Sequence, residues 1–277
     1  MLLAQLTDTH VIGPSNDEVL FVDNNGRLAE AVASLNAERT VPDVVVATGD
    51  LANWGRVDEY LALAELLADL SLPLLVLPGN HDHRQRLRAT FPETPWADAE
   101  HASWAVTIEG VRIIGLDSTV PGQAGAEFDG VREQWLQTEL DRFEGPTVLA
   151  LHHPPFVTGI EWMDNAGFIG LDRLRSVLHQ SAVDGRPVTR IICGHLHRPA
   201  SSAIAGIPAQ VGLSTVQHVA LDLDPRAGVT LINDPVGYLL HRFTGDAWVT
   251  HTRYIATGEA PYVPSWAGNP QAKKTDT

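Results

Sequence analysis

Five short polar motifs, each placed just after a short apolar run, constrain this chain more than any other feature. The apolar runs span residues 2–6, 44–48, 74–77, 148–151 and 190–193. The motifs that follow them are Asp8-Thr9-His10, Gly49-Asp50, Gly79-Asn80-His81-Asp82, His152-His153-Pro154-Pro155 and Gly194-His195-Leu196-His197. Short apolar runs that end at Gly, Pro or a polar residue are typical of buried parallel strands. Because ligands bind beyond the carboxyl ends of such strands, we expect the motifs to meet at one edge of a sheet.

The motifs carry more metal-ligand chemistry than one ion can use. They supply three carboxylates, one amide and six imidazoles. Asp8 and His10 are two residues apart, and in extended chain this spacing puts both side chains on one side; His195 and His197 share it. Asp50 follows a glycine, which permits a close turn. Its carboxylate can therefore bridge two cations ~3.5–4 Å apart. The pattern predicts a two-metal hydrolase.

The series of motifs resembles the calcineurin-like metallophosphoesterases, whose pattern is D-x-H, G-D, G-N-H-D/E, an isolated His and G-H-x-H. The similarity continues through residues 49–56 and through Trp162-Met163-Asp164. It points to the branch of bacterial glycerophosphodiesterases and class III cyclic-nucleotide phosphodiesterases, and covers roughly residues 1 to 255.

The resemblance implies two divalent ions per chain that share one carboxylate. One ion is assigned to Asp8, His10, Asp50 and His197, and the other to Asp50, Asn80, His152 and His195. His153 would support the site without binding metal. With no Cys ligand available, the expected metals are Mn, Fe, Zn or Co.

The expected reaction is hydrolysis of a phosphate ester by a metal-bound hydroxide that attacks phosphorus in line. The resemblance gives His81 a catalytic role, either orienting the substrate or protonating the leaving alkoxide. Asp82 is expected to orient His81.

Four residues are assigned to substrate binding: Asn53, Trp54, Trp162 and His218. Trp54 and Trp162, like Phe21 and Met163, stand in loops beside the motifs, where aromatic residues either line a pocket or only pack. Related glycerophosphodiesterases have the order Thr-Val-His-Gln, whereas residues 215–218 here read Thr-Val-Gln-His. On a strand, a shift of one position turns a side chain to the opposite face.

Each motif taken singly also has a simple structural interpretation. Asp8 and Asp50 are of a type favoured at turns and helix N-caps, and residues 152–155 could form a rigid loop with surface histidines. Five motifs in this order favour the enzyme. The preferred function is hydrolysis of small phosphodiesters, such as glycerophosphodiesters or cyclic nucleotides. The alternatives are a phosphomonoesterase and a non-catalytic metal-binding module.

Composition adds expectations about partners and location. With 19 basic and 34 acidic residues among 277, the net charge is −15, which repels nucleic-acid polymers and anionic membranes. The single cysteine, Cys193, fits a reducing compartment. No signal peptide or bilayer-spanning run is expected. These features predict a cytoplasmic protein with no nucleic-acid or membrane partner. The resemblance adds a small phosphodiester substrate and assembly as a homo-oligomer.

The order of elements predicts an α/β fold, a four-layer α/β/β/α sandwich of two mixed sheets flanked by helices. Helices are expected at about 27–36, 58–70, 84–91 and 131–143, and a hairpin turn at Glu109-Gly110. Residues 1–257 are expected to form one metallophosphoesterase domain, in which about 203–237 could be a cap or oligomerisation segment. Residues 258–277 are expected to form a tail.

Overall fold

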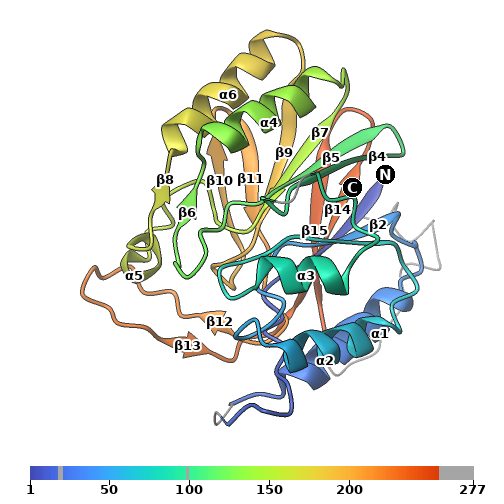
Figure 1. The fold of residues 1–277 in the computed structure, drawn as a ribbon, viewed down its shortest axis with the longest axis vertical. Coiled ribbons are helices and arrows are strands. Elements are labelled where there is room, and N and C mark those ends of the chain that lie inside the picture. The colour runs from blue at the N-terminus through green and yellow to red at the C-terminus, as the bar shows by residue number, and fades with distance from the viewer. Residues whose placement is uncertain (18–20, 98–99, 256–277) are drawn as a thin grey trace, which may run out of the picture.

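The computed structural model describes residues 1–17, 21–97 and 100–255 (Figure 1). Within these residues the helices are α1 (Asn24–Asn36), α2 (Val57–Leu67), α3 (Arg84–Thr90), α4 (Gly130–Asp141), α5 (Glu161–Asp164) and α6 (Leu171–Val183). The strands are β1 (Leu2–Leu6), β2 (Val44–Ala47), β3 (Leu74–Val76), β4 (Trp104–Ile108), β5 (Val111–Leu116), β6 (Ala126–Glu127), β7 (Thr147–Leu151), β8 (Phe168–Ile169), β9 (Val188–Cys193), β10 (Ala200–Ile204), β11 (Ile207–Val211), β12 (His218–Val219), β13 (Leu231–Ile232), β14 (Gly237–Phe243) and β15 (Trp248–Tyr254).

Two mixed sheets form the centre of the molecule. The five-stranded sheet has the order β15-β14-β1-β2-β3, and the six-stranded sheet has the order β10-β11-β9-β7-β5-β4. β1, β2 and β3 run parallel, as do β5, β7, β9 and β11, while β14, β15, β4 and β10 pair antiparallel with their neighbours. The parallel strands therefore end on the same side of each sheet, and the five motifs follow five of these ends.

Alternation along the strands divides the core into three layers. On β2, Val44 and Val46 point into the cluster between the sheets, whereas Val45 and Ala47 point outward to α1 and α2. Because successive side chains of a strand face opposite sides, one continuous apolar run can serve two cores. The predicted α/β/β/α sandwich is thus confirmed.

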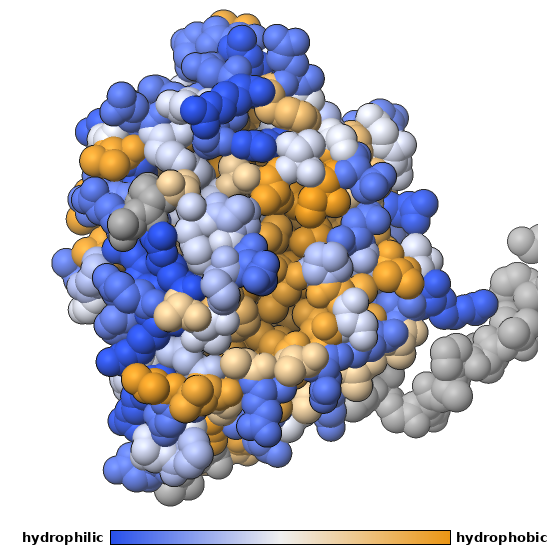
Figure 2. Space-filling model, turned by 45° about the vertical axis from the view of Figure 1, so that its right-hand side comes forward, coloured by the Kyte–Doolittle hydropathy of each residue, from blue (hydrophilic) through white to orange (hydrophobic). Residues whose placement is uncertain are grey.

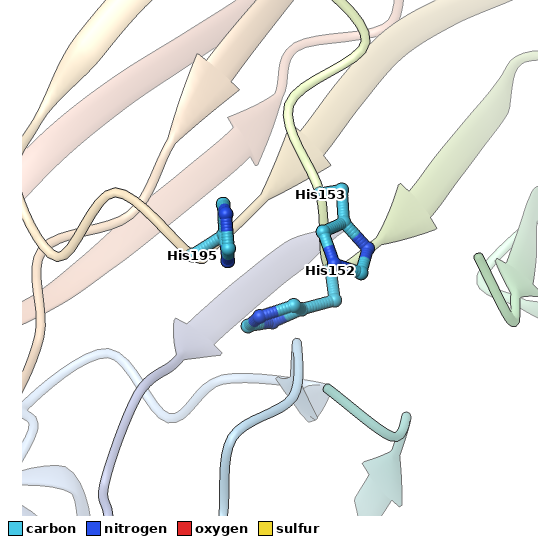
Figure 3. Close-up of side chains that lie close together, drawn as sticks. All are labelled: His152, His153 and His195. Carbon is cyan, nitrogen blue, oxygen red and sulfur yellow. The ribbon is translucent and has the colours of Figure 1, made fainter. Parts of the chain in front are cut away.

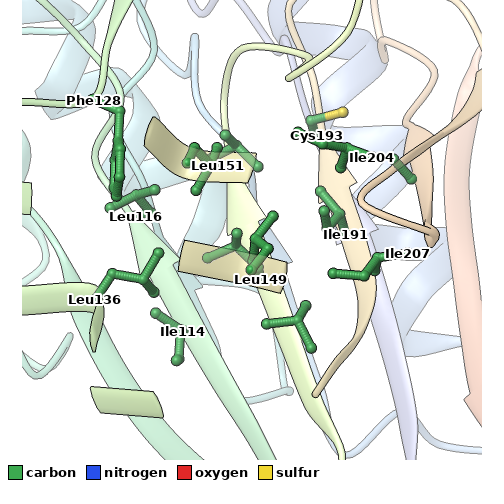
Figure 4. Close-up of a cluster of buried hydrophobic side chains, with 14 of the residues drawn as sticks. Ile114, Leu116, Phe128, Leu136, Leu149, Leu151, Ile191, Cys193, Ile204 and Ile207 are labelled. Carbon is green, nitrogen blue, oxygen red and sulfur yellow. The ribbon is translucent and has the colours of Figure 1, made fainter. Parts of the chain in front are cut away.

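The outer core of the six-stranded sheet lies beneath α4 and α6. Its largest contribution comes from alternate residues of β5, β7 and β9, which Figure 4 shows on one face of these strands. Leu136 of α4 and Leu174 of α6 close this cluster from the helix side. Cys193 is fully buried in it.

Part of the apolar interior reaches one face of the molecule. Figure 2, which turns the right-hand side of Figure 1 forward, shows apolar residues gathered in a hollow that hydrophilic residues surround. Among the described residues, no helix is both long enough and apolar enough to cross a membrane.

The structure changes several predicted boundaries. α1 begins at Asn24 rather than near residue 27, because the Asp23 side chain caps it by accepting a hydrogen bond from the Gly26 amide. α2 ends at Leu67 rather than near residue 70. The turn at Glu109-Gly110 is confirmed: both residues have positive φ, 48° and 74°, as a two-residue type I′ hairpin requires.

Two helices were not predicted. α5 is a single turn, and α6 covers the six-stranded sheet with Leu174, Val177 and Leu178. The spacing of these three residues is a helical signal that was present in the sequence.

The structure divides the segment at 203–237. Its first part belongs to β10 and β11, and β11 pairs parallel with β9 inside the large sheet. The remaining part, residues 218–236, contains β12 and β13, and we call it the arm. Its middle projects from the body of the fold (Figure 1). The predicted tail at 258–277 lies outside the described residues.

Candidate metal centre

The first predicted ligand set is close together at the ends of β1, β2 and β9. One ligand atom from each of four residues lies within 4.8 Å of the others; the residues are Asp8, His10, Asp50 and His197. His10 Nε2 is 3.0 Å from His197 Nε2 and 3.8 Å from Asp50 Oδ2. His197 Nε2 is 3.5 Å from Asp8 Oδ1. Two imidazole nitrogens and two carboxylates thus face one small volume.

The second predicted set lies beside the first and shares Asp50 with it. Asn80 Oδ1 is 3.1 Å from His152 Nε2 and 3.0 Å from His195 Nδ1. Asp50 Oδ2 is 3.3 Å from the same His152 nitrogen. Figure 3 shows His152 and His153, from the loop after β7, close to His195 from the loop after β9. Asp50 therefore stands between the two sets.

Hydrogen bonds to main-chain carbonyls show that these residues fit cations. His152 Nδ1 donates to the Thr48 carbonyl at 2.8 Å, and His197 Nδ1 donates to the Gln217 carbonyl at 3.0 Å. In a neutral imidazole the other nitrogen then carries a lone pair. His152 Nε2 faces the oxygens of Asn80 and Asp50, and a bound cation there would take the place of a proton on this nitrogen. Carbonyls that orient metal-binding histidines in this way are common in metal sites.

The charges of the site are strongly coupled. Burial lowers the pKa of His10 well below its ordinary value and that of His195 to about 3, so both imidazoles are neutral, as ligands must be. Burial opposes charge on Asp50, but His152 and His81 hold the pKa of this carboxyl well below its usual range. The pKa of His152 is raised to about 9, because the attraction of Asp50 outweighs burial. Asp50 thus remains ionised and available to a cation.

Backbone strain is concentrated in the same loops. Seven described residues other than glycine have positive φ, and five of them are predicted ligands: Asp8, His10, Asp50, His195 and His197. The expectation of extended chain at Asp8–His10 and His195–His197 was therefore wrong. Left-handed conformation is costly for a residue with a Cβ and persists where the surrounding structure enforces it. Strain of this kind is typical of functional sites.

Two motif glycines are required by close approach. A Cβ at Gly49, where φ is 96°, would lie 2.6 Å from His152 Nδ1. A Cβ at Gly194 would lie 2.0 Å from Thr7 Oγ1 and 2.9 Å from Asp8 Oδ2. These glycines let the loops approach closely enough for their ligands to meet.

His153 is held by hydrogen bonds at both ring nitrogens. Its Nε2 donates to the Ala124 carbonyl at 3.1 Å, and its Nδ1 is 2.8 Å from Ser118 Oγ. Its ring lies 4.7 Å from that of His195, centroid to centroid. In this arrangement neither nitrogen is available to a metal, although the residue is near enough to belong to the cluster with His152 and His195. His153 instead links the loop at Ala124 to the centre.

His81 and Asp82 do not act as the predicted pair. His81 Nδ1 donates to the Asn53 carbonyl at 2.6 Å, so Asn53 rather than Asp82 orients the ring. The Asp82 carboxylate accepts hydrogen bonds from the amides of Leu51, Ala52 and Gly79 and from the Tyr60 hydroxyl. Asp82 therefore joins two motif loops. The pKa of His81 is raised by Asp50 and the Asn53 carbonyl, against the effect of burial.

A cavity of about 510 Å³, which we call the main cavity, opens above the two ligand sets. Asn53, His81 and Trp162 are part of its wall. Trp54 is not; it is half exposed, with its ring 5.9 Å from that of His81. His218 does not line the cavity either: it is buried, and Gln217 lines the wall instead. The one-residue shift in the sequence thus places an amide where an imidazole was expected.

Several residues that hold the ligands were not predicted. Thr7 Oγ1 donates to Asp8 Oδ2 at 2.7 Å, Ser214 Oγ donates to the Asp8 carbonyl at 2.7 Å, and Asn24 Nδ2 donates to the His10 carbonyl at 2.8 Å. Thr7 adjoins the first motif in the sequence, and this proximity is the only sequence signal for its role. Ser214 and Asn24 carry no signal in the sequence, because only the fold brings them to β1.

Comparison with known proteins relates this chain to phosphoesterases. The family model described as calcineurin-like phosphoesterase matches residues 1–199. The chain is 33% identical over 266 residues to a probable glycerophosphodiester phosphodiesterase GpdQ of Arcobacter nitrofigilis, covering 95% of this chain and 96% of that protein. It is 34% identical over 235 residues to a cAMP/cGMP dual specificity phosphodiesterase of Mycobacterium tuberculosis, covering 83% of this chain and 71% of that protein.

A solved structure agrees in fold. A purple acid phosphatase, PPD1 of yellow lupin, superposes with a TM-score of 0.65 at 11% identity, over 94% of this chain and 52% of that one. At this identity the likeness concerns the sandwich and not the substrate.

Proposed function

Because this chain belongs to the calcineurin-like phosphoesterases, a hydrolytic family, we propose that it is a dinuclear-metal phosphodiesterase of small phosphodiesters. Glycerophosphodiesters and cyclic nucleotides are the substrate classes that the names of its relatives suggest. The proposed ligands are those of the two sets described above, with Asp50 common to both.

The position of Asp50 carries this proposal. Its Oδ2 lies 3.8 Å from His10 Nε2 on one side and 3.3 Å from His152 Nε2 on the other. A carboxylate between two groups of imidazoles is suited to bridge two divalent ions, because each imidazole offers a lone pair to a metal once it is deprotonated. The donors are nitrogen and oxygen, which suits Mn, Fe, Zn or Co.

Divalent ions bound there would supply Lewis-acid activation of the phosphate and a lowered pKa of coordinated water. The protein contributes positioning and proton transfer. With Nδ1 bound to the Asn53 carbonyl, the His81 ring has Nε2 for the substrate. Since His81 lines the main cavity, its Nε2 can donate a proton to the leaving alkoxide.

The wall of the main cavity favours diesters over monoesters. Among the described residues that line it, there is no Arg or Lys. A diester carries one negative charge and two substituents, whereas a monoester carries up to two charges that need more cations. The apolar wall formed by Trp162, Met163 and Val219 instead suits a substituent on phosphorus.

Matched ester pairs test the proposal. The purified protein would be loaded with Mn²⁺ or Zn²⁺, and its metal content measured by mass spectrometry. Bis(4-nitrophenyl) phosphate would be compared with 4-nitrophenyl phosphate, and cyclic AMP with 5′-AMP, at one fixed metal concentration. We expect close to two ions per chain and a higher kcat/KM for each diester. Higher kcat/KM for every monoester would overturn the proposal in favour of a phosphomonoesterase.

A further inference from the structure

A second, smaller cavity adjoins the main one on the side of His195. This side cavity has a volume of about 230 Å³. Most of its wall is apolar and comes from the segment after β7, from the first residue of α6 and from the motif at 194–197: Phe156, Val157, Met163, Phe168, Leu171 and Leu196. Leu196 stands between two predicted ligands in the sequence and is buried. The side cavity is therefore built partly by the metal-binding loop itself.

Three polar side chains of the side cavity, Thr158, Asp164 and His153, are already paired. Asp164 Oδ1 accepts hydrogen bonds from the amide and the hydroxyl of Thr158, and Asp164 Oδ2 accepts from the Gly159 amide at 2.8 Å. His153 uses one nitrogen for the Ala124 carbonyl and has Ser118 Oγ at the other. A hydroxylated or charged group in this cavity would find these partners occupied, whereas an apolar group would lose only water.

The two cavities meet at Met163, Ala166 and His195, which line both. Two of these are small or flexible: Ala166 leaves space, and a Met side chain adapts to what it contacts. His81 lines only the main cavity, and its ring lies 4.8 Å from that of His10. The proposed proton donor, His81, thus lies near His10 of the first ligand set, whereas the side cavity lies near His195 of the second.

We propose that the side cavity binds an aryl or short alkyl substituent that remains on phosphorus while the other substituent leaves near His81. This inference rests on the proposed phosphodiesterase function and names the substrate class more narrowly: diesters with one apolar substituent. An apolar cavity of ~150 Å³ is sufficient to bind benzene. The side cavity therefore has room for a phenyl ring or a butyl chain.

A series of 4-nitrophenyl alkyl phosphates tests the inference. The retained group would be methyl, ethyl, butyl, hexyl or phenyl, while the leaving group and the charge stay constant. We expect kcat/KM to rise with chain length, mainly through KM, by at most about fourfold per methylene. The rise should level off once the cavity is full, at about butyl. Phenyl should match or exceed butyl.

Three variants locate the effect. Ala166→Phe narrows the junction and should flatten the chain-length profile, when each ester is compared with the methyl ester of the same variant. Leu171→Ala enlarges the side cavity and should move the plateau to longer chains. Ala182→Phe makes the same change at an exposed position of α6 that lines neither cavity, and it should keep the wild-type profile.

The outcomes separate the two proposals. Release of nitrophenolate from every diester with a flat wild-type profile would overturn the side-cavity inference and leave the phosphodiesterase standing. A rising profile that Ala166→Phe leaves unchanged would also overturn it. Absence of diester hydrolysis by metal-loaded protein would overturn both.

Discussion

The metal floor and the walls of the main cavity come from different kinds of structure. The floor consists of the predicted ligands, Asp8, His10, Asp50, Asn80, His152, His195 and His197. Of these, Asp8 and His152 are fully inaccessible, and His10 and Asp50 are nearly so. The wall includes Phe21, Val229 and Leu231, which are exposed to 95%, 71% and 44%.

This difference indicates which part of the site performs the chemistry and which part selects the substrate. The floor is held by β1, β2, β3, β7 and β9, by close-packed glycines and by main-chain carbonyls. Residues of the arm, of α5 and of the short stretch at residues 21–22 before α1 carry much of the wall, and none of them belongs to the two large sheets. Substitutions in the floor should therefore cause large losses of metal binding and activity. Substitutions in the wall should cause only small changes in KM and in the choice of substrate.

Asp50→Ala should cause the largest loss. Because this carboxylate is proposed to serve both ions, the variant should bind neither ion well. Its kcat/KM should fall by more than the ~10–100-fold expected for the loss of a residue that only supports a ligand. Metal content and hydrolysis of bis(4-nitrophenyl) phosphate measure both effects. Asn80→Ala is the matched control, and it should lose only one ion. Two retained ions in Asp50→Ala would contradict the bridging assignment.

His81→Ala should keep both ions and lower activity by ~10²–10⁴-fold. The loss should be greatest for esters with poor leaving groups, such as glycerol or ribose alkoxides, because these need a proton. A nitrophenolate leaves without protonation, so bis(4-nitrophenyl) phosphate should be affected less. Steady-state kinetics with both ester types at equal metal content provide the measurement. Equal losses for both would mean that His81 only positions the substrate.

Thr7→Val should weaken metal binding without changing the ligands. The substitution removes the hydroxyl that donates to Asp8 Oδ2 at 2.7 Å in a fully buried position. Removing such a support for a ligand typically lowers metal affinity ~10–100-fold. Metal titration followed by activity would measure the shift, and Thr7→Ser, which keeps the donor, should restore it. An unchanged affinity in Thr7→Val would show that the floor does not need this hydrogen bond.

Trp162→Ala should have the smallest effect. Since Trp162 lines the main cavity, the variant should raise KM for bulky diesters roughly 2–10-fold, in line with the worth of aromatic contacts. Its kcat should be unchanged. Trp54→Ala is the matched comparison, because Trp54 lies outside the wall and should change KM less. A large fall in kcat in Trp162→Ala would contradict the division between floor and wall.

The sequence alone determined the ends of the strands and the residue types that meet there. Because the central strands are buried on both faces, they form continuous apolar runs in the sequence, and the motifs that followed them predicted a shared metal centre. Local signals also predicted the hairpin at Glu109-Gly110. The helical spacing of Leu174, Val177 and Leu178 is a local signal of the same kind for α6.

The tertiary structure decided which atoms face one another. Asp82 stands next to His81 in the sequence, yet the amides of Leu51 and Ala52 occupy its carboxylate. His218 is buried at the start of the arm and does not line the main cavity, whereas its neighbour Gln217 does. The left-handed conformations of Asp8 and His195 could not be predicted either, since L-residues disfavour them.

The physical reason is the range of the forces involved. Apolar periodicity and turn propensity act within a few residues, so they can be read along the chain. The direction of an imidazole nitrogen depends on carbonyls and amides that are distant in sequence, such as Thr48 for His152. Only the folded chain brings these partners together, and their hydrogen bonds determine which donor atoms a metal ion would meet.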